Sequence, residues 1–310
     1  MSKKNEEEFT SSAVKVKKGK ENLAFDIFDV TLTLIILVII IYPLYWTVIA
    51  SFSDPDMVNR GQVLLLPHGV SFFGYQRLFS YTRIWRAYVM TIYYTVLGTA
   101  LNVAVTVSAG YALSRPQLPF RSIIMKFLIF TMFFNGGMIP LYLLIKNIHL
   151  LDTVWALILP TTLSVYNITV ARAFFQGSIP DGIIDAAKID GCSEVRAFFS
   201  IVLPVSPAII SVMVLFHVVF RWNEYFNALL FFSSPSKYPL QLVLRDILLN
   251  AQNAANSMSA SNAKSIVEMA REAQVVKYTS MIVSTLPMLI IYPFLQKYFV
   301  KGVMVGALKG

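Results

Sequence analysis

One stretch combines charge, small residues and fixed spacing in a way that suits mechanical rather than covalent work. Residues 178–204 read as a helix, a turn and a second helix. Pro180 suits the first turn of the first helix, and Gly191 suits a left-handed stop. Ser193 followed by Glu194 is typical of the start of the next helix. The pattern predicts a rigid lever that carries force applied at its turn to the neighbouring helices.

The two predicted helices of this stretch have different faces. The first presents Asp185 and Lys188 in a polar stripe, with Ala186, Ala187 and Asp190 on neighbouring lines, where small side chains allow close approach by another surface. The second repeats apolar residues at helical spacing, which predicts anchors on the following membrane helix: Val195, Phe198, Phe199 and Val202. Periodicity alone favours a plain amphipathic connector on the membrane surface.

A second cluster of polar and aromatic residues follows the fifth long apolar run. Arg221 and Glu224 stand three residues apart, and charges at membrane depth usually face a cavity or each other. Their neighbours add stacking and hydrogen-bonding groups suited to sugar rings and hydroxyls: Trp222, Asn223, Tyr225 and Asn227. If the helix ends near Phe220, all of these are ordinary interfacial residues instead.

Catalytic and metal-binding patterns are not evident. The chain has no glycine-rich loop ending in Lys-Ser/Thr that would cradle nucleotide phosphates. Its three histidines are scattered, its one cysteine is Cys192, and no nucleophile stands beside a base. A membrane enzyme is therefore disfavoured. A secondary transporter should show repeated halves and paired charges in several helices, and neither is present.

The elements that must position these residues are long apolar runs. The 310 residues are 56% hydrophobic and 14% charged, with a mean hydropathy of +0.62. A helix needs about 20 apolar residues to cross a bilayer. Six runs reach this length, which predicts an all-α integral membrane protein with six transmembrane helices: 30–50, 88–113, 123–145, 154–175, 202–220 and 281–299. The fifth run has an alternative end near Phe232.

The net charge of +9 is best explained by orientation in the membrane. Basic residues lie mainly beside the ends of the runs and form no aromatic-studded patch, so nucleic acid is not expected as a partner. The positive-inside rule favours a cytoplasmic N-terminus and C-terminus. The predicted organisation is a cytoplasmic basic tail at 1–25 and a membrane domain at 26–310, with an inner loop at 176–200 and long outer loops at 51–86 and 233–277.

One break in an apolar run and two long loops each leave alternatives open. Asn135, Gly136 and Gly137 break the third run, which is expected either of a discontinuous helix lining a substrate path or of a plain kink. Aromatic residues in loop 51–86 form an interfacial belt or contact a partner. In loop 233–277, a polar stretch at 250–263 precedes a helix-like stretch at 264–276, and loops this long are usually functional or disordered.

The inner loop resembles the EAA motif of ABC-importer permeases, in which Glu-Ala-Ala is followed after three residues by Gly, and after nine more by Ile-x-Leu-Pro. Here Asp185-Ala186-Ala187 precedes Gly191, and the pattern ends at Pro204. The one departure is Asp185, which keeps the charge of the family's Glu with a shorter reach. The resemblance implies that this loop docks on a separate ATPase, through the following residues: Asp185, Ala186, Ala187, Lys188, Asp190, Gly191, Arg196, Phe198 and Pro204.

Nearly the whole chain is similar to the MalG-type permeases of carbohydrate ABC importers, especially the LplC/YtcP-like subgroup. The stretches that carry this are 110–116, 136–144, 150–160, 222–228 and 296–302. The resemblance implies a type I importer permease fold in a bacterial cytoplasmic membrane. It also implies a heterodimer with a second homologous permease, two ATPase subunits that bind ATP and Mg, an extracellular sugar-binding protein, and an oligosaccharide substrate. No cofactor is expected on this chain, and a permease for a non-carbohydrate solute is the alternative.

Overall fold

The structure, a computed structural model, describes residues 20–257 and 276–294, and the regular elements of this part of the chain are all helices. Its elements in chain order are α2 (Lys20–Ser51), α3 (Pro55–Asn59), α4 (Phe73–Ser80), α5 (Thr82–Ser114), α6 (Arg121–Phe133), α7 (Met138–Asn147), α8 (Val154–Ile158), the 3₁₀ turn η1 (Leu159–Thr161), α9 (Val165–Ser178), α10 (Asp181–Ile189), α11 (Glu194–Ala197), the π-helical turn η2 (Phe198–Val202), α12 (Pro207–Trp222), α13 (Phe226–Phe231), the 3₁₀ turn η3 (Pro235–Lys237) and α14 (Leu240–Ser257). A last described helix covers residues 276–294.

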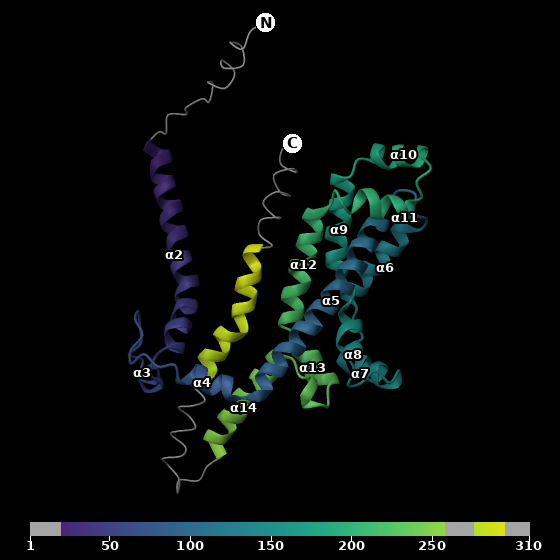
Figure 1. The fold of residues 1–310 in the computed structure, drawn as a ribbon. Helices are drawn as coiled ribbons and strands as arrows, with labels where there is room; N and C mark the ends of the chain where they lie inside the picture. The colour runs from purple at the N-terminus through teal and green to yellow at the C-terminus, as the bar shows by residue number, and fades with distance from the viewer. Residues whose placement is uncertain (1–19, 258–275, 295–310) are drawn as a thin grey trace.

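Helix α5 is the centre of the bundle and packs along both α9 and α12 (Figure 1). Gly110 makes the contact with α9 possible, because a Cβ there would lie 2.6 Å from the Cβ of Ala171. Small residues at such crossings let helix backbones approach closely, which is how membrane helices gain packing energy without a hydrophobic driving force. The position of α5 therefore determines where the ends of α9 and α12 lie.

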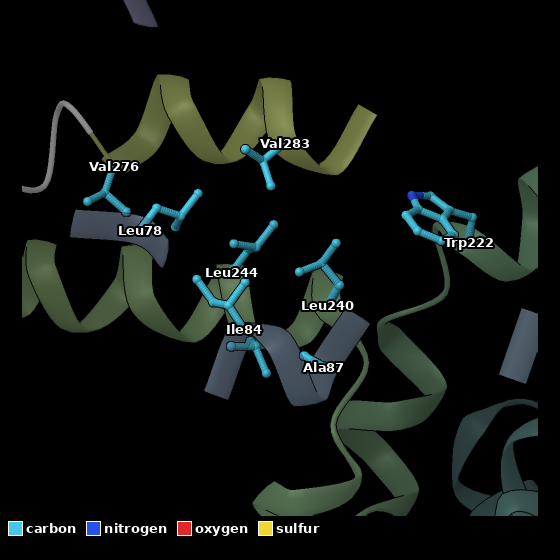
Figure 2. Close-up of a cluster of buried hydrophobic side chains, with 9 residues drawn as sticks. Leu78, Ile84, Ala87, Trp222, Leu240, Leu244, Val276 and Val283 are labelled. Atoms are coloured by element: carbon cyan, nitrogen blue, oxygen red, sulfur yellow. The ribbon is translucent and has the colours of Figure 1, made fainter. Parts of the chain in front are cut away.

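Two apolar cores lie toward opposite ends of α5. One joins α4, α5, α14 and the 276–294 helix, and its side chains converge from these elements in Figure 2, including Leu78, Ile84, Leu240 and Val283. The other joins α5, α9, α10 and α12 around Tyr111 and Phe175. These cores attach the projecting segments at either end to the membrane helices.

The predicted spans are confirmed as straight helices for 30–50 and 88–113, within α2 and α5. The third run is interrupted at residues 135–137, as the sequence indicated, and the fourth is also a bent pair of helices. The fifth run corresponds mainly to α12, which is bent against α11–η2. The bend is 112° between α6 and α7, 53° between α8–η1 and α9, and 88° between α11–η2 and α12. The described residues thus hold two helices that are long and apolar enough to cross a membrane, or five if each bent pair is one span.

Local chemistry explains where the spans break. Gly137 takes φ +86°, and its N–H donates to the Asn135 side chain at 2.8 Å, which turns the chain after α6. Pro207 starts α12, so the fifth helix begins later than the predicted residue 202. It ends at Trp222 and does not continue to Phe232. The sixth predicted span, 281–299, lies within the described residues only up to 294.

The connecting segments hold more structure than the sequence indicated. Loop 51–86 contains α3, α4 and the first turn of α5. In loop 233–277, α14 runs through the first part of the polar stretch 250–263, because its amphipathic pattern begins at Leu240. The helix-like stretch at 264–276 lies outside the described residues, apart from its last residue, and so do residues 1–19 of the predicted tail.

Candidate functional site

The predicted lever is present as a projecting elbow, made of α10, the turn at Gly191 and α11. In Figure 1 it extends beyond the end of the bundle, with α10 lying across the direction of α9. Gly191 has φ +76°, its N–H donates to the Lys188 carbonyl at 2.9 Å, and the Cys192 N–H donates to the Ala187 carbonyl at 2.8 Å. This pair of bonds is a Schellman stop. Ser193 then caps α11 by accepting from the Arg196 N–H at 3.4 Å. The predicted helix, turn and helix are confirmed.

An ion pair that the sequence analysis missed closes the elbow. Lys188 on α10 lies 2.7 Å from the Glu194 carboxylate on α11. This hydrogen bond raises the pKa of Lys188 above its ordinary value, so the lysine stays charged at physiological pH. An exposed pair contributes little to stability. Its effect is on geometry, because it joins the two helices across the turn.

One face of α10 is buried against the bundle, and the opposite face is exposed. Ile184 is buried in the core around Tyr111, and Ala187 is buried as well. Asp185, Ala186 and Asp190 are exposed, and Ile189 is 87% exposed. A short helix that is fixed on one side and presents an aspartate, an alanine and an isoleucine on the other suits docking to another protein.

The predicted anchors of the second helix are only partly correct. Phe198 packs on Tyr111 with ring centroids 5.0 Å apart, and Val202 is fully buried. Phe199, however, is 63% exposed, and Val195 is exposed as well. The prediction assumed α-helical spacing throughout, but residues 198–202 form a π turn with a bond from the Leu203 N–H to the Phe198 carbonyl. The changed register leaves Phe199 outside the core.

Two arginines join α5 and α9 at the end of the bundle next to the elbow. Arg115, just after α5, donates to the Phe175 carbonyl on α9 at 3.4 Å, and Arg172 on α9 donates to the Leu113 carbonyl on α5 at 3.1 Å. Helix C-terminal carbonyls lack intrahelical partners and attract cations. The reciprocal bonds therefore hold the ends of α5 and α9 together. Arg196 and Pro204, also predicted for this region, are exposed.

At the opposite end of α12, Arg221 is 3% exposed and belongs to a buried network. Its guanidinium donates to the carbonyls of Leu157 and Ile158 and to Asn102 Oδ1, each at 3.0 Å. Glu224 lies 3.9 Å away. The first two acceptors are the last carbonyls of α8, which also accept from the hydroxyls of Thr161 and Thr162 just before the break. Arg221 thus holds the broken helix in place.

The rest of this network was missed from the sequence. His217, one turn before Arg221, lies 3.1 Å from the Asn102 amide, 3.3 Å from the Thr106 hydroxyl and 3.4 Å from the Asn167 amide. These groups join α5, α9 and α12. The available signal was the i, i+4 spacing of Asn102 with Thr106 and of His217 with Arg221 inside apolar runs.

The remaining candidate pathway residues fall into two groups. Trp222 is buried and donates to the Ser284 carbonyl at 2.8 Å, while Asn227 donates to the buried Glu224. Asn223 and Tyr225 are exposed at the turn that follows α12. The trio at 135–137 is exposed at the bend between α6 and α7. The structure therefore brings Arg221 and Glu224 together and leaves the 135–137 bend as a separate feature.

Asp152 joins two segments of the chain at the α14 end of the bundle. Its carboxylate accepts from the N–H groups of Ser233 and Ser234 at 3.1 Å and pairs with Lys237 at 2.6 Å. Burial alone would raise the pKa of Asp152, but the bonds from Lys237, Ser234 and Ser233 outweigh it and lower the pKa well below its ordinary value. The carboxylate therefore has a structural role, which is to hold these two segments together.

The structure has the features of a membrane-embedded transport subunit: broken membrane helices, a polar network at helix ends, and an elbow that reaches past the bundle. Among the described residues, no group of three His, Cys, Asp or Glu side chains could hold a metal ion. Residues 71–305 match the family model described as the binding-protein-dependent transport system inner membrane component. The chain belongs to this family. It is an inner-membrane, multi-pass permease subunit of an ABC importer and not an enzyme, and the family places no cofactor on it.

Relatives and a solved structure agree over nearly the whole chain. It is 36% identical to the polygalacturonan/rhamnogalacturonan transport system permease protein YtcP of Bacillus subtilis, covering 94% of this chain and 100% of the relative. It is 34% identical to LplC of the same organism, covering 94% and 97%. A bacterial ABC transporter involved in the import of the acidic polysaccharide alginate matches with a TM-score of 0.79 and 28% identity, over 91% of this chain and 98% of that chain. The predicted resemblance is confirmed.

Proposed function

We propose that this chain is one half of a permease pair that imports an oligosaccharide derived from a polysaccharide. The proposal is supported by full-length similarity to permeases named for polygalacturonan/rhamnogalacturonan and arabinooligosaccharide transport, and to the alginate importer. The family name supplies a binding protein and an ATPase as partners. The further expectations are a second homologous permease, two ATPase copies and a sugar-specific binding protein. A non-carbohydrate solute remains the alternative.

The exposure of α2 supports the proposal of a second permease. None of the apolar window of this helix, within residues Phe25–Ser51, is buried in the chain itself. In Figure 1 it stands apart from the bundle along most of its length. A helix with this separation has room to pack against a second subunit. Basic residues near the elbow and the tail support cytoplasmic termini, which would place the elbow on the ATPase side.

The observation that carries coupling is the exposed face of α10. Asp185, Ala186 and Ile189 project from a helix that the buried Ile184 and Ala187 fix to the bundle. Because the Gly191 stop and the Lys188–Glu194 pair keep the elbow rigid, a push on this face is transmitted to α9 and α12. We assign α10 as the contact with the ATPase subunit.

The substrate path is assigned to groups that line a cavity rather than to the buried arginine. Tyr225 lines a cavity of about 480 Å³ together with Gln241, Arg245, Ser280 and Ser284. An aromatic ring beside amide, hydroxyl and guanidinium groups suits a sugar ring and its hydroxyls. Arg221, Trp222 and Glu224 would act by positioning this turn. Asn223, Asn227 and the bend at 135–137 remain candidates for further contacts along the path.

The coupling assignment is tested with Asp185→Lys in the transporter reconstituted in vesicles with its cognate partners. Reversing this exposed charge should leave membrane insertion intact while lowering ATP-dependent uptake at least about tenfold, equivalent to a loss of roughly 1.4 kcal/mol in coupling. Ser122→Lys, an exposed change on α6 outside the elbow, is the matched control and should retain uptake. Full uptake by the Asp185 variant would refute the assignment.

A further inference from the structure

The loop that follows α3 carries three consecutive leucines on its surface. Leu64, Leu65 and Leu66 are 62%, 66% and 69% exposed. They lie in loop 51–86, which is expected on the outer side of the membrane. A run of three exposed apolar side chains is unfavourable in water unless another phase covers it.

The backbone of this loop is held by aromatic side chains of α2. Trp46 Nε1 donates to the Val63 carbonyl at 2.8 Å, the Tyr42 hydroxyl donates to the Leu64 carbonyl at 3.3 Å, and the Tyr45 hydroxyl donates to the Leu65 carbonyl. Three successive carbonyls therefore each have a side-chain donor. In water such carbonyls are satisfied by solvent, whereas in an apolar phase each unpaired one is costly.

The donors place the loop at the depth of the membrane boundary. An α-helix rises 1.5 Å per residue, so Tyr42 lies about 14 Å and Trp46 about 8 Å before the end of α2 at Ser51. Figure 1 shows the chain after α3 running back beside this part of α2. Tyrosine and tryptophan favour the headgroup level. The leucines consequently lie beside a membrane-spanning helix at its outer interfacial belt.

We propose that Leu64, Leu65 and Leu66 form an interfacial anchor inserted among the acyl chains of the outer leaflet. Neighbouring side chains in a non-helical segment point in different directions, so a protein surface that covered one leucine would leave another exposed. A fluid acyl-chain phase covers all three. The absence of any charged side chain from residues 61–67 also fits this phase.

The test is the depth of a spin label in the assembled transporter in liposomes. Every variant carries Cys192→Ser, which removes the single native thiol, and the label is attached at Leu65→Cys or, as the control, at exposed Asn59→Cys on α3. At Leu65, collisions with oxygen should exceed collisions with a water-soluble nickel chelate several-fold more than at Asn59. Equal ratios at the two sites would place the loop in water and overturn the proposal. Protection from both reagents would place it against protein and also overturn it.

The side chains that donate to these carbonyls can be tested separately. Tyr45→Phe removes the hydroxyl that bonds to the Leu65 carbonyl while keeping the ring, so it should shift the label at Leu65 toward chelate access. An unchanged ratio would contradict the argument that these bonds hold the backbone in the apolar phase. Neither measurement depends on which solute is transported, so failure of the anchor and failure of the proposed function are distinguishable.

Discussion

Arg221 shows how a charge at membrane depth can serve structure. Its side chain satisfies the last carbonyls of α8 and the Asn102 side chain, and Gly98 leaves room for it, since a Cβ there would lie 2.7 Å from its Nε atom. From the sequence, this arginine was grouped with candidate sugar contacts. Spacing could identify it as facing a cavity or a partner. It could not show that the partners are carbonyls 64 and 63 residues earlier, at the end of α8.

Replacing this arginine should therefore weaken folding. Arg221→Leu removes the donor to the Asn102 side chain and one donor to each of the Leu157 and Ile158 carbonyls. It also leaves the buried Glu224 without its ion-pair partner, so the free energy of unfolding should fall by about 3 kcal/mol. Unfolding in mixed micelles measures this, with exposed Arg86→Leu as a control that should change stability by less than about 0.5 kcal/mol. Gly98→Ala should also destabilise, without altering the arginine. Unchanged stability in both variants would contradict the network.

Asp152 provides a pH-dependent test. Its pKa is lowered in the folded state, so its contribution to stability is present above the unfolded pKa of about 3.9 and is lost as pH falls below that value toward the folded pKa. Asp152→Asn should lower the free energy of unfolding by about 2 kcal/mol at pH 7. The difference from wild type should shrink as pH falls below about 4. A difference that stays constant from pH 7 to pH 3 would contradict this structural role.

At the scale of elements, the elbow was predictable because its signals are local. A proline start, a glycine stop and a serine cap each act within one turn of helix, and all three are present as predicted. The π turn at residues 198–202 was not predictable, since its bonding pattern depends on how Phe198 packs against Tyr111. The bend between α8–η1 and α9 was likewise not predictable, because Arg221 holds the end of α8 from a distant part of the sequence.

The glycine at the elbow should be indispensable for coupling. Gly191→Pro removes the N–H that bonds to the Lys188 carbonyl and forces φ to about −65°, far from the observed +76°. The variant should insert normally, yet its ATP-dependent uptake should fall at least about tenfold, because α10 can no longer hold its angle. Gly177→Ala, in open space on α9, should retain uptake. Uptake by the proline variant at the control's rate would show that the rigid turn is unnecessary.

At the scale of the whole molecule, the chain is one part of a larger machine. Composition and run length were enough to predict a helical membrane protein, and the spaced motif at 185–204 was enough to indicate its family. The arrangement around α5 could not be predicted, because contacts such as Gly110 with Ala171 join residues distant in sequence. The elbow and the exposed α2 both present surfaces suited to other subunits, in agreement with a binding-protein-dependent transport system.

The most direct test of this account is the energy source for uptake. Vesicles containing this chain with its cognate permease, ATPase and binding protein should accumulate a labelled oligosaccharide when ATP is present on the ATPase side. Accumulation should continue when ionophores collapse all ion gradients, and it should stop in the Asp185→Lys variant. Uptake that requires an ion gradient and proceeds without ATP would contradict the account.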